Sequence, residues 1–311
     1  MHTSKLTSTR NDERTDVKFD RPSRCPGSGD NRLVAALNSM MPLEQAAPLS
    51  TTAIIEALRP EWRQRCDVEA VAVTASTNED LVTRARTQQP AQFLLRAADF
   101  QSAGRGRNRR PWCAAAGDAL LFSVAIPLSS ASQSLPAVTL ACGVALAESF
   151  AERGIAVQLK WPNDIRVDGS KLGGILTELV ADRSARQTLV IGVGINLHLD
   201  DATRRAIGQP VTALDQLPGA AAQSREQWIG EFGSAILAAA SQFFELGFEP
   251  FRARFNRLLE SRGQFVDLLT AGPGEPSLSG HLIEVDHDGR LVIETEGQRH
   301  AVSVGDVSVR R

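Results

Sequence analysis

The stretch at residues 101–112 reads Gln-Ser-Ala-Gly-Arg-Gly-Arg-Asn-Arg-Arg-Pro-Trp and combines two glycines, one proline and four arginines. Glycine is unfavourable inside helices and strands, and unpaired arginines are rarely buried, so this composition predicts a mobile loop. Arginine side chains and free backbone N–H groups bind carboxylates and phosphates well. From this stretch alone two interpretations stay open: a solvated surface loop, which is the more common case, and a loop that binds an anion.

The composition is that of an ordinary globular protein. Its 311 residues suffice for one large or two smaller domains, with 42% hydrophobic and 23% charged residues. The formal net charge of −2 argues against a global basic surface for nucleic acid. Four cysteines without CxxC spacing indicate reduced thiols in a cytoplasmic protein, and five scattered histidines predict no metal site built from protein side chains.

The sequence predicts neither a membrane span nor a secretory signal. Pro127 and Pro136 divide the uncharged run at residues 119–147 into a strand and a helix. The N-terminus is polar and lacks the apolar centre of a signal peptide. Residues 1–45 are rich in charges, Pro, Gly and Ser, so we expect a disordered or non-native leader without a helix-turn-helix.

Hydrophobic periodicity and turn residues predict an α+β domain over residues 46–262. Helices are expected at 53–58, 76–86, 135–153, 227–246 and 250–261, the second of them opened by a Ser-x-x-Glu capping box. Strands are expected at 68–73, 92–98, 118–126, 157–160, 165–167, 173–180 and 188–194. Because hairpins join most of these strands, the order favours a mixed, mostly antiparallel sheet with flanking helices over a doubly wound fold.

Residues 263–311 differ in character from the rest of the chain. Short alternating strands are expected at 265–269, 280–284, 290–294, 300–304 and 307–310, separated by tight turns such as Asp288-Gly289. Roughly fifty residues of this kind predict a small all-β barrel as a second domain.

Four further motifs bear on the arginine-rich loop: Ser76-Thr77-Asn78, Lys-Trp-Pro-Asn-Asp at 160–164, Lys-Leu-Gly-Gly-Ile-Leu at 171–176 and Gly-Val-Gly-Ile-Asn at 192–196. Taken singly, each has an ordinary explanation, such as a helix cap, a solvated lysine or a β-bulge. A dinucleotide site fails because 192–196 has neither the third glycine nor a following helix, and the chain contains no P-loop motif.

In this order and spacing the motifs resemble the biotin–protein ligase family, over residues 74–310 and including the closing Gly-Asp-Val-Ser-Val-Arg at 305–310. The resemblance implies a catalytic domain similar to class II aminoacyl-tRNA synthetases, followed by an SH3-like β barrel. The family loop usually reads Gly-Arg-Gly-Arg-x-Gly-Arg-x-Trp, and Arg109 here replaces its third glycine. Without a recognisable DNA-binding module, the chain is expected to be a monofunctional ligase that does not bind DNA.

The resemblance implies a reaction in two steps. The carboxylate of biotin attacks the α-phosphate of ATP to give biotinyl-5′-adenylate, and a lysine of a carboxylase's biotin carboxyl carrier domain then attacks the mixed anhydride. Two anions meet in the first step, so cations and N–H donors must neutralise charge, assisted by Mg²⁺ that the nucleotide phosphates hold. A homodimer through a sheet edge is compatible with the sequence, which does not require one.

The resemblance also implies roles for individual residues. Lys160 is expected to bridge the biotin carboxylate and the phosphate, with Arg105 and Arg107 as the other catalytic cations. The biotin and adenylate pocket is expected to comprise Ser76, Thr77, Asn78, Gln101, Gly104, Arg105, Gly106, Arg107 and Lys160. The nucleotide side is expected to include Trp112, Asn163, Asp164, Lys171, Gly173 and Asn196, with Asp164 either orienting the incoming amine or capping a turn. Trp112 and Trp161 are expected either to line the pocket or to pack in the core.

The sequence also allows two alternatives to a biotin ligase, namely a lipoate ligase or octanoyl transferase and a nucleic-acid-binding protein. Lipoate–protein ligases and octanoyl transferases share the catalytic architecture, but the loop, the 160–164 motif and the small β domain together favour biotin. A nucleic-acid-binding module could use the arginines for phosphates, but the net charge and the absence of tyrosine for base stacking argue against it.

Overall fold

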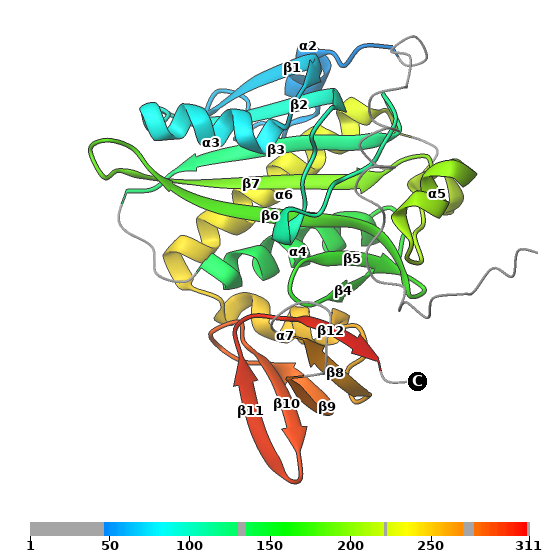
Figure 1. Cartoon of the computed structure of the whole chain (residues 1–311). Helices are drawn as coiled ribbons and strands as arrows, with labels where there is room; N and C mark the ends of the chain where they lie inside the picture. The colour runs from blue at the N-terminus through cyan, green and yellow to red at the C-terminus, as the bar shows by residue number, and fades with distance from the viewer. Residues whose placement is uncertain (1–46, 130–134, 221–222, 270–276, 310–311) are drawn as a thin grey trace, which may run out of the picture.

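The computed structural model describes residues 47–129, 135–220, 223–269 and 277–309. Figure 1 shows a large sheet with helices packed on it and a smaller sheet at the C-terminal end. The leader expected at residues 1–45 lies outside the described residues. No helix within the described ranges is long and apolar enough to cross a membrane.

Seven strands form the main sheet, in the order β1-β2-β3-β7-β6-β5-β4. They are β1 (Cys66–Thr74), β2 (Phe93–Gln101), β3 (Ala119–Pro127), β4 (Gln158–Lys160), β5 (Asp164–Val167), β6 (Ser170–Ala181) and β7 (Gln187–Asn196). β1 and β2 run parallel with α3 (Thr77–Thr87) between them in sequence, whereas every other pair of neighbours in this sheet is antiparallel. The predicted mixed, mostly antiparallel sheet is therefore confirmed.

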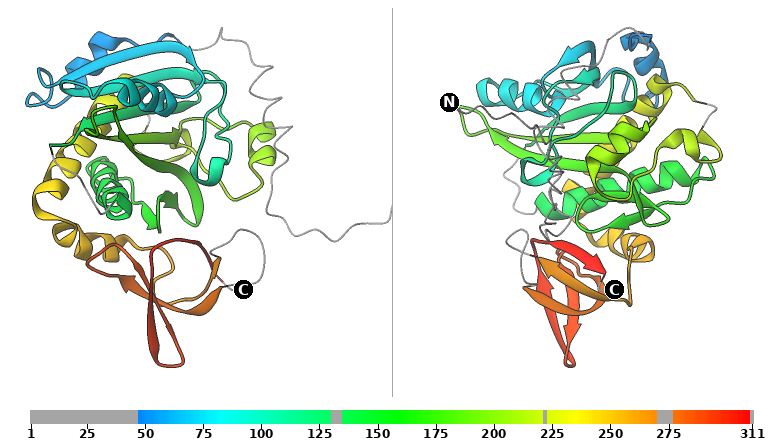
Figure 2. Two further views of the ribbon diagram at one scale, coloured as in Figure 1. Left: turned by 60° about the vertical axis from the view of Figure 1, so that its left-hand side comes forward. Right: turned by 45° about the vertical axis from the view of Figure 1, so that its right-hand side comes forward.

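Helices cover both faces of the main sheet (Figures 1 and 2). The helices α2 (Thr51–Ala57), α4 (Leu135–Ala151) and α6 (Arg225–Leu246) pack over the larger core on one face, and α3 packs on the other. Strand β3 is buried on both faces, as its apolar sequence predicts: Phe122 lies in the larger core, and Ala125 packs with Leu81 and Val82 of α3.

One short helix was not expected from the sequence. The helix α5 (Asp201–Ile207) begins where the Asp200 side chain accepts a hydrogen bond from the Thr203 backbone N–H at 2.6 Å. It ends at Gly208, whose φ of 68° lies in the left-handed region that glycine adopts readily. Both end signals are ordinary ones, but the seven residues between them are too few to show a periodic pattern.

The C-terminal residues form a separate antiparallel sheet in the order β11-β10-β9-β8-β12, which confirms the predicted all-β character of this part. Its strands are β8 (Phe265–Leu269), β9 (Leu278–Val285), β10 (Leu291–Thr295), β11 (Gln298–Val302) and β12 (Asp306–Val309). The helix α7 (Glu249–Leu258) leads into it, and Asn256 exchanges two hydrogen bonds with the Val285 backbone, at 2.9 and 2.7 Å. Trp161 is buried in the core and donates to the Gly289 carbonyl at 3.1 Å, so it ties the two sheets together.

Candidate active site

Three glycines leave one surface of the main sheet without side chains, on the same side as α3. Gly192 and Gly194 alternate along β7, and Gly174 of β6 pairs directly with Gly194. A Cβ at Gly192 would lie 2.7 Å from Asn78 Oδ1, and one at Gly194 would lie 2.7 Å from the Trp112 ring. We call Gly174, Gly192 and Gly194 the glycine floor, since other side chains lie directly against the backbone there.

Hydroxyl and amide side chains, together with the Glu178 carboxylate, gather at the α3 end of the floor, and we call them the polar end. Gln101 Oε1 accepts hydrogen bonds from the Thr77 backbone N–H at 2.6 Å and from the Thr77 hydroxyl at 3.1 Å. The Thr77 hydroxyl also lies 2.8 Å from the Ser123 hydroxyl, and Ser123 is the cross-strand partner of Gly192. Asn78 donates from Nδ2 to the Glu178 carboxylate. The structure thus brings together three predicted residues, Thr77, Asn78 and Gln101, with two that were not predicted.

Ser76 serves as the N-cap of α3, where its hydroxyl accepts from the Glu79 backbone N–H at 3.4 Å. The carboxylate of Glu79 does not complete the predicted capping box, because it pairs with the Arg105 guanidinium instead. The start of the helix is therefore connected to the arginine-rich loop by an ion pair.

The loop itself crosses from α3 to the C-terminal sheet. Backbone hydrogen bonds of 2.8 Å join Trp112 N–H to the Gly104 carbonyl and Gly106 N–H to the Arg110 carbonyl. The Arg107 guanidinium lies 3.4 Å from both the Asn163 side-chain oxygen and the Asp306 carboxylate. Arg110 contacts the same carboxylate at 3.1 Å. At Arg109, the position where the family usually has glycine, φ is +57°.

Trp112 lies over the middle of the floor, against Gly194. Its indole N–H is buried and has no hydrogen-bond partner among the described residues. The two tryptophans therefore lie in different surroundings, because Trp112 borders the floor and Trp161 packs in the core.

Positive charges gather at the opposite end of the floor, which we call the cationic end. The pairing runs across the sheet from Lys160 on β4 to Asp164 on β5, then to Gly174 and Gly194. Lys171 Nζ forms an ion pair with Asp164 at 2.6 Å and lies 3.5 Å from the position of a Cβ at Gly174. At about 4.8 Å per strand, four strand spacings place β4 about 19 Å from β3.

The Lys160 ammonium has no hydrogen bond or ion pair among the residues that the structure describes. Burial lowers its pKa below the ordinary lysine value, and the nearby Arg166 guanidinium lowers it further, against the attraction of three carboxylates. A desolvated ammonium without a direct partner is suited to an incoming anion.

The remaining predicted residues occupy supporting positions. Asn163 donates from Nδ2 to the Ile175 carbonyl at 2.9 Å, and Asn196 donates to the Thr212 carbonyl at 3.0 Å. A Cβ at Gly173 would meet the core side chain of Ile195 and lie 2.6 Å from the Gly194 carbonyl. Gly173 therefore faces the core, and its neighbour Gly174 borders the floor.

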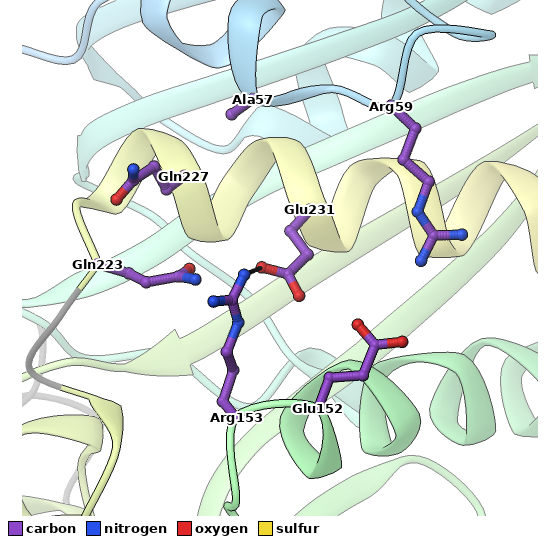
Figure 3. A pocket seen from close by; sticks show the side chains of 7 residues that line it. All are labelled: Ala57, Arg59, Glu152, Arg153, Gln223, Gln227 and Glu231. Atoms are coloured by element: carbon purple, nitrogen blue, oxygen red, sulfur yellow. Dashed lines mark hydrogen bonds and ion pairs between the residues drawn. The ribbon is translucent and has the colours of Figure 1, made fainter.

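Two other features lie away from the glycine floor. A surface hollow of about 420 Å³ lies between the ends of α2, α4 and α6, and Figure 3 shows its mixed lining of arginine, glutamate and glutamine, with Arg153 and Glu231 joined at 2.8 Å. None of the glycine-floor residues lines it. The one grouping of described His, Cys, Asp and Glu side chains close enough to share a metal is Asp286, His287 and Asp288, in the turn after β9. Asp286 already accepts from Arg290 there.

Comparison with known proteins agrees with this fold. Residues 70–196 match the family model described as "Biotin/lipoate A/B protein ligase family". That segment extends from β1 to the end of β7 and includes the floor, the polar end and the arginine-rich loop. The fold and the site thus define a domain of the biotin and lipoate ligase class.

Individual relatives narrow this class. The biotin–[acetyl-CoA-carboxylase] ligase of Mycobacterium tuberculosis is 33% identical over 255 residues, covering 79% of this chain and 89% of the relative. The bifunctional ligase/repressor BirA of Escherichia coli is 28% identical over 245 residues, covering 78% of this chain and 74% of BirA. The structure of the biotin protein ligase from Aquifex aeolicus in complex with biotin and ATP is 25% identical, with a TM-score of 0.65 over 79% of this chain and 99% of that one. The chain belongs to the biotin–protein ligase family.

Proposed function

We propose that this protein is an ATP-dependent ligase that activates biotin as biotinyl-5′-adenylate and transfers the biotinyl group to a lysine of a biotin carboxyl carrier domain. One observation carries the proposal: a single glycine floor joins a pocket of hydroxyl and amide side chains to a cationic end, where the Lys160 ammonium is largely desolvated. Biotin has the matching form, with a neutral cyclic urea at one end and a carboxylate at the other. The relatives support the same assignment, since one is a biotin–[acetyl-CoA-carboxylase] ligase and another is a biotin protein ligase in complex with biotin and ATP.

The polar end suits the urea ring. Thr77, Asn78, Gln101 and Ser123 supply hydroxyl and amide groups, which can both donate and accept hydrogen bonds. Thr77 bonds to Gln101 and Ser123, and Asn78 bonds to Glu178, so these side chains are held in place before any ligand arrives, which lowers the entropy lost on binding. Trp112 is positioned to cover the ring or the chain that leads from it.

The cationic end suits the reaction between two anions. Lys160, Lys171 and Arg107 would stabilise the charge that develops between the carboxylate and the α-phosphate. The carboxylates near these cations are already engaged, Asp164 by Lys171, Asp306 by Arg107 and Glu260 by Arg166, so the set fits a magnesium ion held by the nucleotide phosphates. Such an ion would supply further neutralisation of the phosphate charge.

The loop suits the second step. An acyl-adenylate is hydrolysed if water reaches it, so a loop that closes over it protects the intermediate. Gly104 and Gly106 allow close backbone approach, while Arg105 and Arg107 reach opposite ends of the site. Asp164, which is paired with Lys171, would orient the amine of the carrier lysine on exchange of that ion pair.

We further infer that residues 46–262 and 263–311 act as two domains in a cytoplasmic enzyme that does not bind DNA. The separate sheets support the division, and the buried, unpaired thiols of Cys66, Cys113 and Cys142 support a reducing compartment. Self-association through a sheet edge remains compatible with this proposal.

The proposal is tested by incubating the protein with biotin, ATP and magnesium and analysing the products by mass spectrometry. We expect biotinyl-5′-adenylate and pyrophosphate, followed by labelling of an added carrier domain. Lipoate in place of biotin is the matched control, since lipoate lacks the urea ring. Adenylate formed from lipoate and not from biotin would favour the lipoate ligase alternative and contradict the proposal.

A further inference from the structure

We propose that Glu178 is a positioning residue for substrate recognition. It fixes the side-chain amide of Asn78 so that Oδ1 of Asn78 faces the pocket as an acceptor for a ring N–H of the bound cyclic urea. The inference rests on the proposed function, and it concerns a residue two positions after the motif at 171–176 that was not among the predicted site residues.

The first step is the contact between the two side chains. Glu178 lies on β6, and Asn78 lies in the first turn of α3, which packs over that strand. The Asn78 amide donates from Nδ2 to the Glu178 carboxylate. No ion pair and no other hydrogen bond engages the Glu178 side chain among the residues that the structure describes. Its carboxylate is therefore directed at Asn78 and is not part of a surface ion-pair network.

The second step concerns the direction of the amide. A side-chain amide can rotate by half a turn and exchange its donor and acceptor positions, but a carboxylate only accepts hydrogen bonds. Glu178 consequently selects the orientation in which Nδ2 points toward it and Oδ1 points away. In that orientation Oδ1 lies directly above the floor, 2.7 Å from where a Cβ at Gly192 would be.

The third step is that this oxygen lacks a partner. Asn78 is only 6% exposed, and its Oδ1 is buried without a hydrogen bond among the described residues. Buried acceptors in native proteins nearly always have a partner, so an exception at a ligand floor indicates a group that the ligand supplies. The ligand group must be a donor, and the ring nitrogens of a cyclic urea carry N–H groups.

The side-chain amide of Gln101 at the polar end is also held in one orientation, but there the fixed partner is a donor instead of an acceptor. The Thr77 backbone N–H can only donate, so Gln101 must present Oε1 to it. Its Nε2 then points toward Gly104, 3.1 Å from the position of a Cβ there. The pocket therefore offers one amide oxygen and one amide N–H₂, which complement the N–H and C=O groups of a urea. A site of this kind discriminates strongly against analogues that lack one of these groups.

The experiment compares Glu178→Leu and Glu178→Gln with the wild-type protein in adenylate formation. We expect Glu178→Leu to raise the KM for biotin by about tenfold while kcat and the KM for ATP stay within twofold, because only the orientation of Asn78 is released. Glu178→Gln should restore much of the affinity, since its Oε1 can accept from Asn78. Glu284→Leu is the matched control, because Glu284 is also a half-buried strand glutamate but lies in the C-terminal sheet.

A second readout separates positioning from a merely structural effect. In each of two cyclic carbamate isosteres of biotin, an oxygen atom replaces one ring N–H. The wild-type protein should reject one isostere at least about tenfold more strongly than the other in kcat/KM, and Glu178→Leu should lose that preference. Thermal melting of every variant checks that the fold is retained.

An unchanged KM for biotin in a folded Glu178→Leu protein would overturn the positioning role, as would a raised KM with the isostere preference intact. Either result leaves the proposed function standing, because the wild-type protein would still form the adenylate. Failure of the wild-type protein to form adenylate from biotin would overturn both.

Discussion

The two ends of the glycine floor hold their polar groups in different ways. At the polar end, the uncharged side chains of Gln101 and Ser123 both bond to Thr77, whose backbone N–H and hydroxyl make contacts of 2.6 to 3.1 Å. At the cationic end, Lys171 is paired with Asp164, whereas Lys160 has no direct partner in the described chain. The polar end thus leaves one buried amide oxygen, Asn78 Oδ1, for a ligand to satisfy, and the cationic end leaves positive charge for a ligand to compensate. Under the proposed function, recognition and reaction would take place at different ends of one surface.

The largest expected effect is the loss of reaction when a cation is removed. Lys160→Ala and Lys171→Ala should each slow adenylate formation by about 100- to 1,000-fold, as is typical when a group that stabilises transition-state charge is lost. Pyrophosphate exchange measures this rate, and biotin binding without ATP should change much less. If folded Lys160→Ala protein exchanged pyrophosphate at the wild-type rate, Lys160 would not be the residue that bridges carboxylate and phosphate. Lys171 would then be assigned that role.

Lys160 also allows a stability test with a defined sign. Because burial lowers its pKa, the charged form is disfavoured in the folded state, and stability is lower below the folded pKa than above it. Lys160→Met should therefore raise the melting temperature at neutral pH while it abolishes exchange. A lower melting temperature would mean that the ammonium makes stabilising contacts.

Filling the floor should have the next largest effect. Gly194→Ala places a methyl group 2.7 Å from the Trp112 ring, so the ring must move. We expect this repacking to cost about 1–3 kcal/mol and to weaken the binding of biotin. Trp112→Leu in the same chain should recover part of the loss. Gly143→Ala on α4 is the matched control, since its Cβ would have only ordinary contacts, the nearest at 3.5 Å.

At the polar end the expected effect is on binding alone. Gln101→Leu removes the acceptor of two hydrogen bonds from Thr77 and should raise the KM for biotin by about tenfold, or about 1.4 kcal/mol. The value of kcat should stay near that of the wild-type protein. A matching fall in kcat would show that the two ends of the floor are not separable.

The loop contact with the C-terminal sheet should have a smaller effect. Arg107 lies 3.4 Å from Asp306 in a partly exposed ion pair. Removing this contact should destabilise the closed loop by about 1 kcal/mol, which is a factor of about five in its equilibrium constant. Arg107→Gly should release the adenylate about fivefold faster and label nearby lysines indiscriminately. Retention of the adenylate by gel filtration measures this, and unchanged retention with strict carrier specificity would contradict the covering role of the loop.

The smallest effect is expected at Arg109, where φ is +57°. A residue with a Cβ is strained there, but glycine also gains entropy in the unfolded chain, so Arg109→Gly should stabilise the fold by only about 0.5 kcal/mol. This corresponds to a rise in melting temperature of about 1–2 °C. Arg110→Gly is the contrasting control, because φ of −63° suits any residue and the change should destabilise.

Much of the local structure was predictable from the sequence. Periodicity and turn residues located the strand Phe265–Leu269 without error, and the Ser76 cap and the apolar pattern of β3 were also confirmed. The insertion of β7 between β3 and β6 was not predictable, because it depends on pairing between distant segments.

The faces of individual residues were harder to predict than the motifs. A bulge between Ile165 and Arg166 shifts the pairing of β5 with β6. Successive residues of β6 point to opposite faces of the sheet, so Gly174, paired with Gly194, borders the floor and Gly173 faces the core. Ser123 and Glu178 are polar residues in apolar strands, which was an available signal. Only the register across the sheet shows that both face the polar end.

The contact between Arg107 and Asp306 joins residues that are 199 positions apart in sequence. Closing so long a loop of chain is entropically unfavourable, so contacts of this kind form late in folding. The arginine-rich loop should therefore gain its anchor only after both sheets have formed. Local opening of the C-terminal sheet would free the loop while the main sheet stays intact, and amide hydrogen exchange should show residues 104–110 losing protection before β3 and β7.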